Sequence, residues 1–146
     1  MKYWGGEINW LTPAEMSNFK SMFFESTKKR ITAEGLASSS AKIIKPLSVI
    51  MSSRAPIGYL AINLNDCTTS QGCKSITRYS DDLFDLNYLY FLIKSKVKQY
   101  NSESSGTTFK EISGSEFGNT IVSIPPLFEQ RRICKLLESI ISTIAF

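Results

Sequence analysis

The chain has 146 residues, of which 42% are hydrophobic and 12% aromatic, and this composition excludes a wholly disordered protein. Its 17 basic and 13 acidic side chains give a net charge of +4, which favours a polyanionic partner without requiring one. Lys135 and Glu138 interrupt the apolar C-terminus, and no secretory signal follows Met1. We therefore expect a cytoplasmic protein without a membrane span.

The three cysteines, Cys67, Cys73 and Cys134, are expected to be reduced thiols, because disulfides are rare in the cytoplasm. A Cys67–Cys73 disulfide is the alternative. The chain has no histidine, and three dispersed cysteines alone do not make an ordinary tetrahedral zinc site. We expect neither a metal nor a cofactor.

In the N-terminal half, the local signals change from helix to strand. Thr12-Pro13-Ala14-Glu15 has the form of a capping box with proline at the first helical position, so a short helix is expected there. From residue 41 onward the pattern favours β structure, with a tight connection at residues 54–58 and a polar loop at residues 65–72. The predicted strands are residues 42–45, 48–53, 59–64 and 73–79.

Two helices are predicted between residues 80 and 120. Around residues 85–100, apolar side chains recur at helical spacing, with aspartates before the helix and lysines toward its end, as the helix dipole favours. Ser113-Gly114-Ser115-Glu116 is a second capping box, and Gly118 is expected to end that helix.

The stretch at residues 121–133 divides the chain. Residues 121–124 have strand character and run into Pro125-Pro126, which stop a strand and suit the first turn of a helix. Glu129 lies in that first turn, where the dipole favours an anion. The following apolar residues recur at spacings of 4, 3 and 4, as in a coiled-coil seam: Ile133, Leu137, Ile140 and Ile144. We expect this helix to pair with a second chain, the alternative being that it packs on its own domain.

These elements predict a mixed α/β (α+β) fold. We expect a curved, mainly antiparallel sheet with peripheral helices, followed by a projecting helix of the coiled-coil type. Residues 1–125 form the compact domain in this scheme, and residues 126–146 begin the helix that meets a partner.

Several kinds of catalytic chemistry are missing from the sequence. Without histidine there is no Ser-His or Cys-His nucleophile, and there is no glycine-rich phosphate loop or acidic-x-Lys nuclease pairing. Ile124-Pro125-Pro126-Leu127 lacks the Asn or Asp of the similar loop in amino-methyltransferases, so we interpret it as a helix start. We expect no catalysis by this chain alone.

Motifs spread along almost the whole chain give it a family likeness. With these residues the chain resembles one target-recognition half of a type I restriction-modification specificity subunit. The matching segments are Tyr3-Trp4-Gly5-Gly6, Ile8-Asn9-Trp10-Leu11-Thr12, Ile31-Thr32-Ala33-Glu34-Gly35-Leu36, Ser39-Ser40-Ala41-Lys42, Met51-Ser52-Ser53-Arg54-Ala55-Pro56-Ile57-Gly58, Gln71-Gly72-Cys73-Lys74, Gly106-Thr107-Thr108 and Ile124-Pro125-Pro126-Leu127 with Glu129-Gln130.

The resemblance implies a non-catalytic reader of double-stranded DNA. In this family two such domains, separated by long packed helices, each read one half of a split target, and modification subunits supply the methyltransferase chemistry. The implied partners are DNA, the modification subunits and, through them, the restriction subunit. The chain starts inside the family's opening motif and stops short of the long spacer. We therefore expect a half-subunit, an expressed fragment or the product of a broken gene.

The candidate DNA-binding residues lie in or near these motifs. Arg54, assisted by the Ser52 and Ser53 hydroxyls, is expected to clamp a phosphate, or else to pin its loop to a carboxylate. The basic run Lys28-Lys29-Arg30 either neutralises phosphates or forms a solvated face. Further candidates for phosphate contact are Thr107, Thr108 and Lys110.

Base recognition has separate candidates. Gln71 suits adenine and Lys74 suits guanine, with bracing of the loop as the equal alternative. Following the family logic, base specificity is expected in the segments that match no motif, at residues 18–29 and 64–70.

Three rival functions stay open at this point. The chain is alternatively a remnant that dimerises without reading DNA, an enzyme of unrecognised type, or the recognition domain of a fused restriction-methyltransferase.

Overall fold

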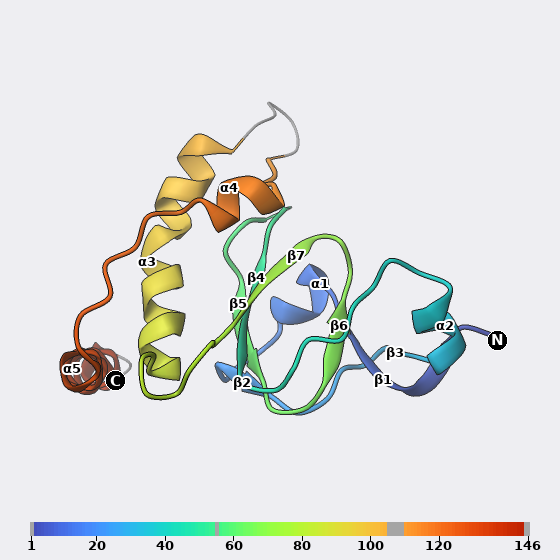
Figure 1. The fold of residues 1–146 in the computed structure, drawn as a ribbon, viewed down its shortest axis with the longest axis horizontal. Coiled ribbons are helices and arrows are strands. Elements are labelled where there is room, and N and C mark those ends of the chain that lie inside the picture. The colour runs from blue at the N-terminus through green and yellow to red at the C-terminus, as the bar shows by residue number, and fades with distance from the viewer. Residues whose placement is uncertain (1, 55, 105–109, 145–146) are drawn as a thin grey trace.

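The computed structural model describes residues 2–54, 56–104 and 110–144. Two small β-sheets lie beside each other in the middle of the molecule, and the longest helix within the domain covers the outer face of one of them (Figure 1). The fifth helix lies at the edge farthest from the N-terminus (Figure 1).

The three-stranded sheet is built on the N-terminal strand. Its strand order is β3-β1-β6, where β1 is Trp4–Leu11, β3 is Arg30–Ile31 and β6 is Cys67–Thr69. β3 is antiparallel to β1 and β6 is parallel to it. Gly5 has a φ of +82° where the β1–β3 register shifts, a conformation that glycine adopts without strain.

The four-stranded sheet has the order β2-β5-β4-β7, with β2 at Phe23–Phe24, β5 at Leu60–Asn63, β4 at Ser48–Ser52 and β7 at Cys73–Thr77. β4 is buried along its whole length because both of its faces are covered. Ile50 packs into the core between the two sheets, whereas Val49 and Met51 face the opposite side and pack with α3 residues. This alternation follows from the two-residue period of a strand.

Five helices complete the described part of the chain: α1 (Pro13–Met16), α2 (Ala33–Ala37), α3 (Leu86–Glu103), α4 (Gly114–Gly118) and α5 (Leu127–Ile144). The starts predicted from local signals are confirmed for α1, α3, α4 and α5. Ser113 and Glu116 form a complete capping box. At α1 the Thr12 hydroxyl caps Glu15 N–H, but the Glu15 carboxylate accepts the backbone N–H of Lys28 and so ties α1 to the basic run.

The predicted fold class is confirmed, since the molecule mixes helices with mainly antiparallel strands. The predicted strands at residues 48–53, 59–64 and 73–79 correspond to β4, β5 and β7. β1 was missed, because its two glycines and two tryptophans give no regular alternation.

Three predicted segments are corrected. Residues 42–45 form only one bridge, from Ile44 to Cys67. The expected loop at residues 65–72 contains β6, because β1 offers it a pairing edge that is distant in sequence. Residues 121–124 are not a strand; the Ser123 carbonyl oxygen accepts a hydrogen bond from the Tyr88 hydroxyl instead of from a neighbouring strand.

The cysteine prediction is also answered. Cys67, Cys73 and Cys134 are all buried free thiols, so the alternative disulfide does not form. Among the residues that the structure describes, no helix is long and apolar enough to cross a membrane.

Candidate nucleic-acid interface

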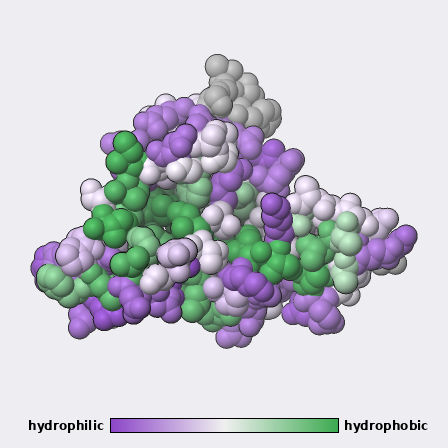
Figure 2. All heavy atoms as spheres, viewed as in Figure 1, coloured by the Kyte–Doolittle hydropathy of each residue, from purple (hydrophilic) through white to green (hydrophobic). Residues whose placement is uncertain are grey.

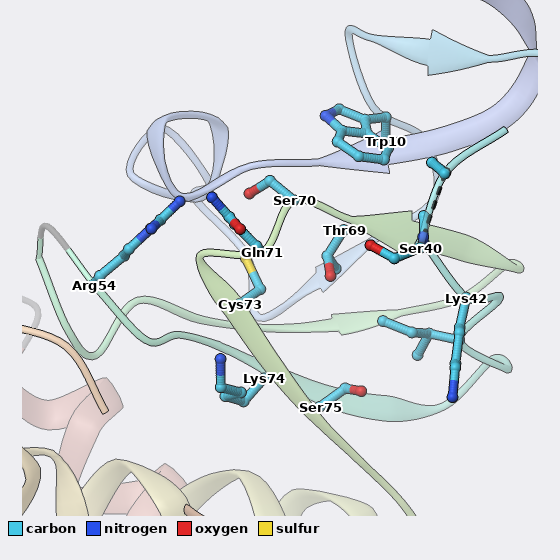
Figure 3. A pocket seen from close by; sticks show the side chains of 13 residues that line it. Trp10, Ser40, Lys42, Arg54, Thr69, Ser70, Gln71, Cys73, Lys74 and Ser75 are labelled. Carbon is cyan, nitrogen blue, oxygen red and sulfur yellow. Dashed lines mark hydrogen bonds between the residues drawn. The ribbon is translucent and has the colours of Figure 1, made fainter. Parts of the chain in front are cut away.

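A groove of about 680 Å³ lies where the two sheets meet (Figure 3). Trp10 of β1 and Thr69 of β6 line it from the three-stranded sheet, and Lys74 and Ser75 of β7 line it from the four-stranded sheet. Residues 70–72 carry the chain from one sheet to the other, anchored by a hydrogen bond from Ser70 N–H to the Leu11 carbonyl (2.9 Å). The groove is therefore a direct consequence of the chain crossing between sheets.

The groove has a basic lining. Lys42, Arg54 and Lys74 contribute positive charge, and its lining among the described residues includes no acidic side chain. Figure 3 shows Lys42 and Arg54 on opposite sides of the groove, with Trp10 along its upper wall. Five hydroxyl side chains and one amide add hydrogen-bonding groups: Ser39, Ser40, Thr69, Ser70, Ser75 and Gln71. Positive charge combined with neutral hydrogen-bonding groups suits a polyanion with readable edges.

Arg54 is the best-positioned of the predicted residues. Its side chain crosses Gly72 so closely that a Cβ at that glycine would lie 3.2 Å from Arg54 Nε and 3.2 Å from Pro13 Cγ. A loose ion pair with Glu111 (3.9 Å) holds the guanidinium from one side, yet 38% of the side chain stays exposed. Both roles considered for Arg54 thus have a basis: it braces a loop against a carboxylate while presenting its cation to the groove.

Gln71 and Lys74 reach the same groove from either side of Gly72. Gln71 is exposed at the tip of the connection between β6 and β7, and it lines the same groove as Arg54 (Figure 3). Lys74 is half-buried, and its ammonium lies 3.4 Å from the Ser53 hydroxyl. Three of the predicted residues, Arg54, Gln71 and Lys74, therefore come together.

Ser52 and Ser53 support this arrangement from beneath and are fully buried. The Ser52 hydroxyl donates to the Pro56 carbonyl and accepts the backbone N–H groups of Gly58 and Tyr59. Ser53 pairs by its backbone with Gly72 and Ile112. Because burial removes both hydroxyls from the surface, these serines shape the loop that carries Arg54 and are not phosphate ligands in this conformation.

The basic run lies elsewhere. Arg30 is paired with Asn9 in the β1–β3 ladder, so its side chain is on the face of the sheet opposite to Trp10, and it contacts Glu7 at 3.8 Å. Lys28 and Lys29 are exposed beside it. This placement matches the solvated-face interpretation better than a direct contact in the groove.

The remaining candidates are only partly described. Thr107 and Thr108 lie outside the described residues. Lys110 is exposed, and its ammonium donates to the Asn101 carbonyl at 2.7 Å, which closes the end of α3. Of the two segments expected to carry base specificity, residues 64–70 contribute Thr69 and Ser70 to the groove, whereas residues 18–29 do not line it.

Sequence reasoning missed several lining residues, notably Trp10, Ser39, Ser40 and Lys42. A signal was present, because all four belong to the motifs that carry the family resemblance. What the sequence lacked was the pairing of β1 with β6, which sets Trp10 opposite Thr68, next to the groove residue Thr69. Trp10 also packs edge-on against Trp4, with ring centroids 5.6 Å apart, so its indole is held in place.

The thiol beside the groove is inert in character. Cys73 is buried, and burial raises its pKa to about 12, although Lys74 and Arg54 oppose that shift. A thiol that stays protonated is a poor nucleophile. Cys73 is part of the core instead, and its sulfur lies 4.0 Å from that of Met16.

The predicted seam on α5 is split between two environments. Ile133 and Leu137 are half-buried on the side where α5 meets α3, so the alternative of packing on the domain holds for the first half of the helix. Ile140 and Ile144 are exposed, by 46% and 76%. Figure 2 shows hydrophobic side chains also over the segment between α4 and α5, where Ile121 is exposed. The C-terminal half of α5 thus keeps an uncovered apolar face.

The chain is similar to known proteins along almost its whole length. A family model described as "Type I restriction modification DNA specificity domain" matches residues 1–146. The specificity subunit of the type I restriction enzyme MjaIX from Methanocaldococcus jannaschii is 35% identical over 139 residues, which is 94% of this chain and 32% of that protein.

Two solved structures have the same fold. The HsdS subunit from Thermoanaerobacter tengcongensis matches with a TM-score of 0.70 and 22% identity. A chain from a structural study of complex assembly and conformational transition in a type I restriction-modification system matches with a TM-score of 0.67 and 25% identity. Each match covers 97% of this chain and 32% of the other, so the chain spans about a third of the length of these relatives.

Proposed function

Because this chain belongs to the type I restriction-modification DNA specificity domain family, we propose that it reads one half-site of a split DNA target for a restriction-modification complex. It contributes no catalysis in this proposal. Separate modification subunits, and through them the restriction subunit, act at the address that the chain selects.

The observation that carries the proposal is the basic groove between the two sheets. Lys42 and Arg54 stand on opposite sides of it and Lys74 rises from β7 (Figure 3). Cations placed this way bind phosphates without regard to sequence, and so set the register of the protein on the duplex. Arg54 is suited to this role because its side chain lies against Gly72 and is paired with Glu111, yet 38% of it stays exposed.

Base selection is assigned to the loop between β6 and β7. Gln71 is exposed at its tip, and a glutamine amide pairs with the N6 and N7 positions of adenine in the major groove. Thr69 and Ser70 flank it with hydroxyls that donate or accept. The anchored backbone of Ser70 limits the entropy lost when these side chains bind.

The division of labour is proposed to fall at the tandem prolines. Residues 1–125 read DNA, and residues 126–146 begin the helix that meets a second copy or another specificity domain. The exposed apolar residues Ile140 and Ile144 support this assignment. Pairing through this helix would bring together the two domains that are needed to read the two halves of a split target.

The test is selection of bound duplexes from a random-sequence library by the full chain, followed by affinity measurements on the enriched motif. We expect a short enriched motif. The double variant Lys42→Gln/Arg54→Gln should lose binding by at least about tenfold, since each charge-assisted contact contributes roughly 1.5 kcal/mol. The matched control Lys98→Gln/Lys135→Gln removes two exposed charges from helices away from the groove and should bind as the wild type does.

Other outcomes separate the rival functions. A stable dimer that enriches no sequence would identify a remnant that only associates. Nicking of plasmid DNA by the purified chain with a divalent metal would instead identify an enzyme.

A further inference from the structure

Gln130 is the most deeply buried residue of α5. Its side chain is fully buried although it is polar, whereas most of the helix is exposed. A buried amide is costly unless its hydrogen-bonding groups are satisfied. Its partners therefore show what the residue does.

The Gln130 amide ties together the starts of two helices. Its Nε2 donates to the carbonyl oxygens of Leu83 and Pro125, both at 2.8 Å, and its Oε1 accepts the backbone N–H of Asp85 at 2.9 Å. Leu83 and Asp85 lie in the last three residues before α3, and Pro125 is the second residue before α5. Both amide hydrogens are used, which fixes the orientation of the side chain.

A second set of contacts from α5 meets Asp85. Cys134 is buried with its sulfur 3.7 Å from Asp85 Oδ1, and Arg131 lies 3.9 Å from Asp85 Oδ2. Asp85 is itself the N-cap of α3, accepting the N–H of Tyr88 at 3.0 Å. The same short segment thus caps α3 and receives α5.

These contacts end before the apolar half of α5. Among the described residues, the last hydrogen bond from α5 to the domain joins the side chains of Asn87 and Glu138, and Ile140 beyond it is exposed. The helix is therefore held at its base, while the part suited to a second chain projects away. The direction of projection depends on the base, because a small rotation there moves the far end by several ångströms over a helix of this length, about 27 Å.

We propose that the Gln130 side chain fixes the direction in which α5 leaves the domain, and thereby the separation of the two half-sites that a pair of these chains reads on one duplex. This inference rests on the proposed function. Gln130 is a positioning residue: it lies outside the groove and acts through the angle between α5 and α3.

The first experiment measures that angle directly, by residual dipolar couplings of backbone N–H groups in the full chain. In the wild type, the couplings of α3 and α5 should fit one common orientation. In Gln130→Leu, which keeps the size but loses all three hydrogen bonds, the couplings of α5 should shrink relative to those of α3. The control Gln99→Leu changes an exposed glutamine of α3 and should leave both sets unchanged.

Gln130→Glu separates positioning from packing. A carboxylate there faces two carbonyl oxygens that it cannot donate to, so its pKa should lie above the ordinary range for glutamate. As the pH falls through that pKa, the acid regains one donor and the α5 couplings should recover in part, whereas the wild type should show no such change. This variant also decides the matter if Gln130→Leu fails to fold. Couplings of α5 that stay at wild-type values in both variants would overturn the proposal.

The second experiment tests the consequence for DNA. Duplexes carry two copies of the motif selected by the wild type, at every separation across one helical turn. The wild type should prefer one separation by about tenfold. Gln130→Leu should keep its affinity for a single copy and lose that preference.

The two experiments fail in different ways. A preserved preference in Gln130→Leu overturns the inference while the proposed function stands. A wild type that selects no sequence overturns the proposed function, and with it the half-site consequence, while the couplings still report whether Gln130 sets the angle.

Discussion

At the scale of single residues, Arg54 and Gly72 form a closely packed pair at the groove. The arginine side chain lies so close to position 72 that a Cβ there would be only 3.2 Å from its Nε and would force a small shift. Burial of Ser52, whose hydroxyl holds three groups of the loop after it, keeps the backbone at Arg54 in place. The guanidinium is positioned by packing as much as by its ion pair.

Gly72→Ala should therefore weaken DNA binding about fivefold, which corresponds to roughly 1 kcal/mol. The substitution itself replaces none of the proposed DNA-binding side chains. The added methyl group would lie 3.2 Å from both Arg54 and Pro13, so the arginine has to move. Fluorescence anisotropy on the selected duplex measures the change. Gly118→Ala, where open space surrounds the new methyl group, is the control, and equal affinities for both variants would refute this account.

The buried thiols make a second prediction at this scale. Burial raises the pKa of Cys67 from 9.0 to about 12, so the unfolded chain releases that proton at a lower pH than the folded chain does. Unfolding then releases protons, and the free energy of unfolding should fall as the pH rises from about 9 to about 12. In Cys67→Ala this fall should be shallower by up to about 1.4 kcal/mol per pH unit.

Urea denaturation at a series of pH values provides the measurement. Wild type and Cys67→Ala share the buried tyrosines Tyr88, Tyr90 and Tyr100, so their contribution cancels in the difference. The two curves should converge as the pH rises; parallel curves would mean that Cys67 does not contribute.

At the scale of elements, the two halves of α5 lie in different environments. In the first half Gln130 and Cys134 bind the segment just before α3, and in the second half Ile140 and Ile144 are exposed to solvent. A helix of this length is only marginally stable alone in water, which favours a partner for the exposed half. The helix predicted from this spacing is confirmed, but two residues of its predicted seam, Ile133 and Leu137, are half-buried.

Ile140→Lys/Ile144→Lys should convert a self-associated chain to a monomer in sedimentation velocity. Two charges placed in an apolar contact lose hydration without gaining partners. Neither isoleucine belongs to the core clusters of the domain. The folded domain should therefore remain intact in the variant, with a cooperative thermal unfolding transition. The control Ser139→Lys/Ser142→Lys adds the same two charges on the polar face and should stay associated. If both double variants were monomers, the added charge itself, and not the loss of the apolar seam, would explain the dissociation.

At the scale of the whole molecule, the net charge of +4 is modest, and what matters is where the charge lies. Three cationic side chains line the groove between the sheets, whereas Lys28, Lys29 and Arg30 lie outside it. Family membership, inferred from scattered motifs, is confirmed by the match over residues 1–146. The contacts that turn this membership into recognition of a particular sequence remain the proposal made above.

The logarithm of the association constant for the selected duplex should fall linearly with the logarithm of the salt concentration. Neutralising three phosphates predicts a slope of about −3, and Arg54→Gln should reduce its magnitude by about 1. Lys28→Gln should leave the slope unchanged, since that residue lies away from the groove. Titrations at several salt concentrations test both expectations, and a slope altered equally by the two variants would place the basic run in contact with DNA.

Local chemistry allowed the sequence by itself to predict four of the five helices in the described residues, the fold class and the family, whereas the short helix α2 was not predicted. The residues at Thr12, Asp85, Ser113 and Pro125-Pro126 set helix starts through contacts within one turn, so neighbouring letters suffice to predict them. The buried strands β4 and β5 were visible for a similar reason, since runs of apolar residues report burial directly.

Only the tertiary structure decided how the strands are shared between two sheets and which residues meet in the groove. Asn9 pairs with Cys67, a partner 58 positions away, and that pairing brings Trp10 into one wall with Thr69, beside Arg54 and Lys74. It also showed Ser52 and Ser53 to be buried and Arg30 to lie on the opposite face. The physical reason is that strand pairing joins segments across long loops, and its register depends on partners that no local window of sequence contains.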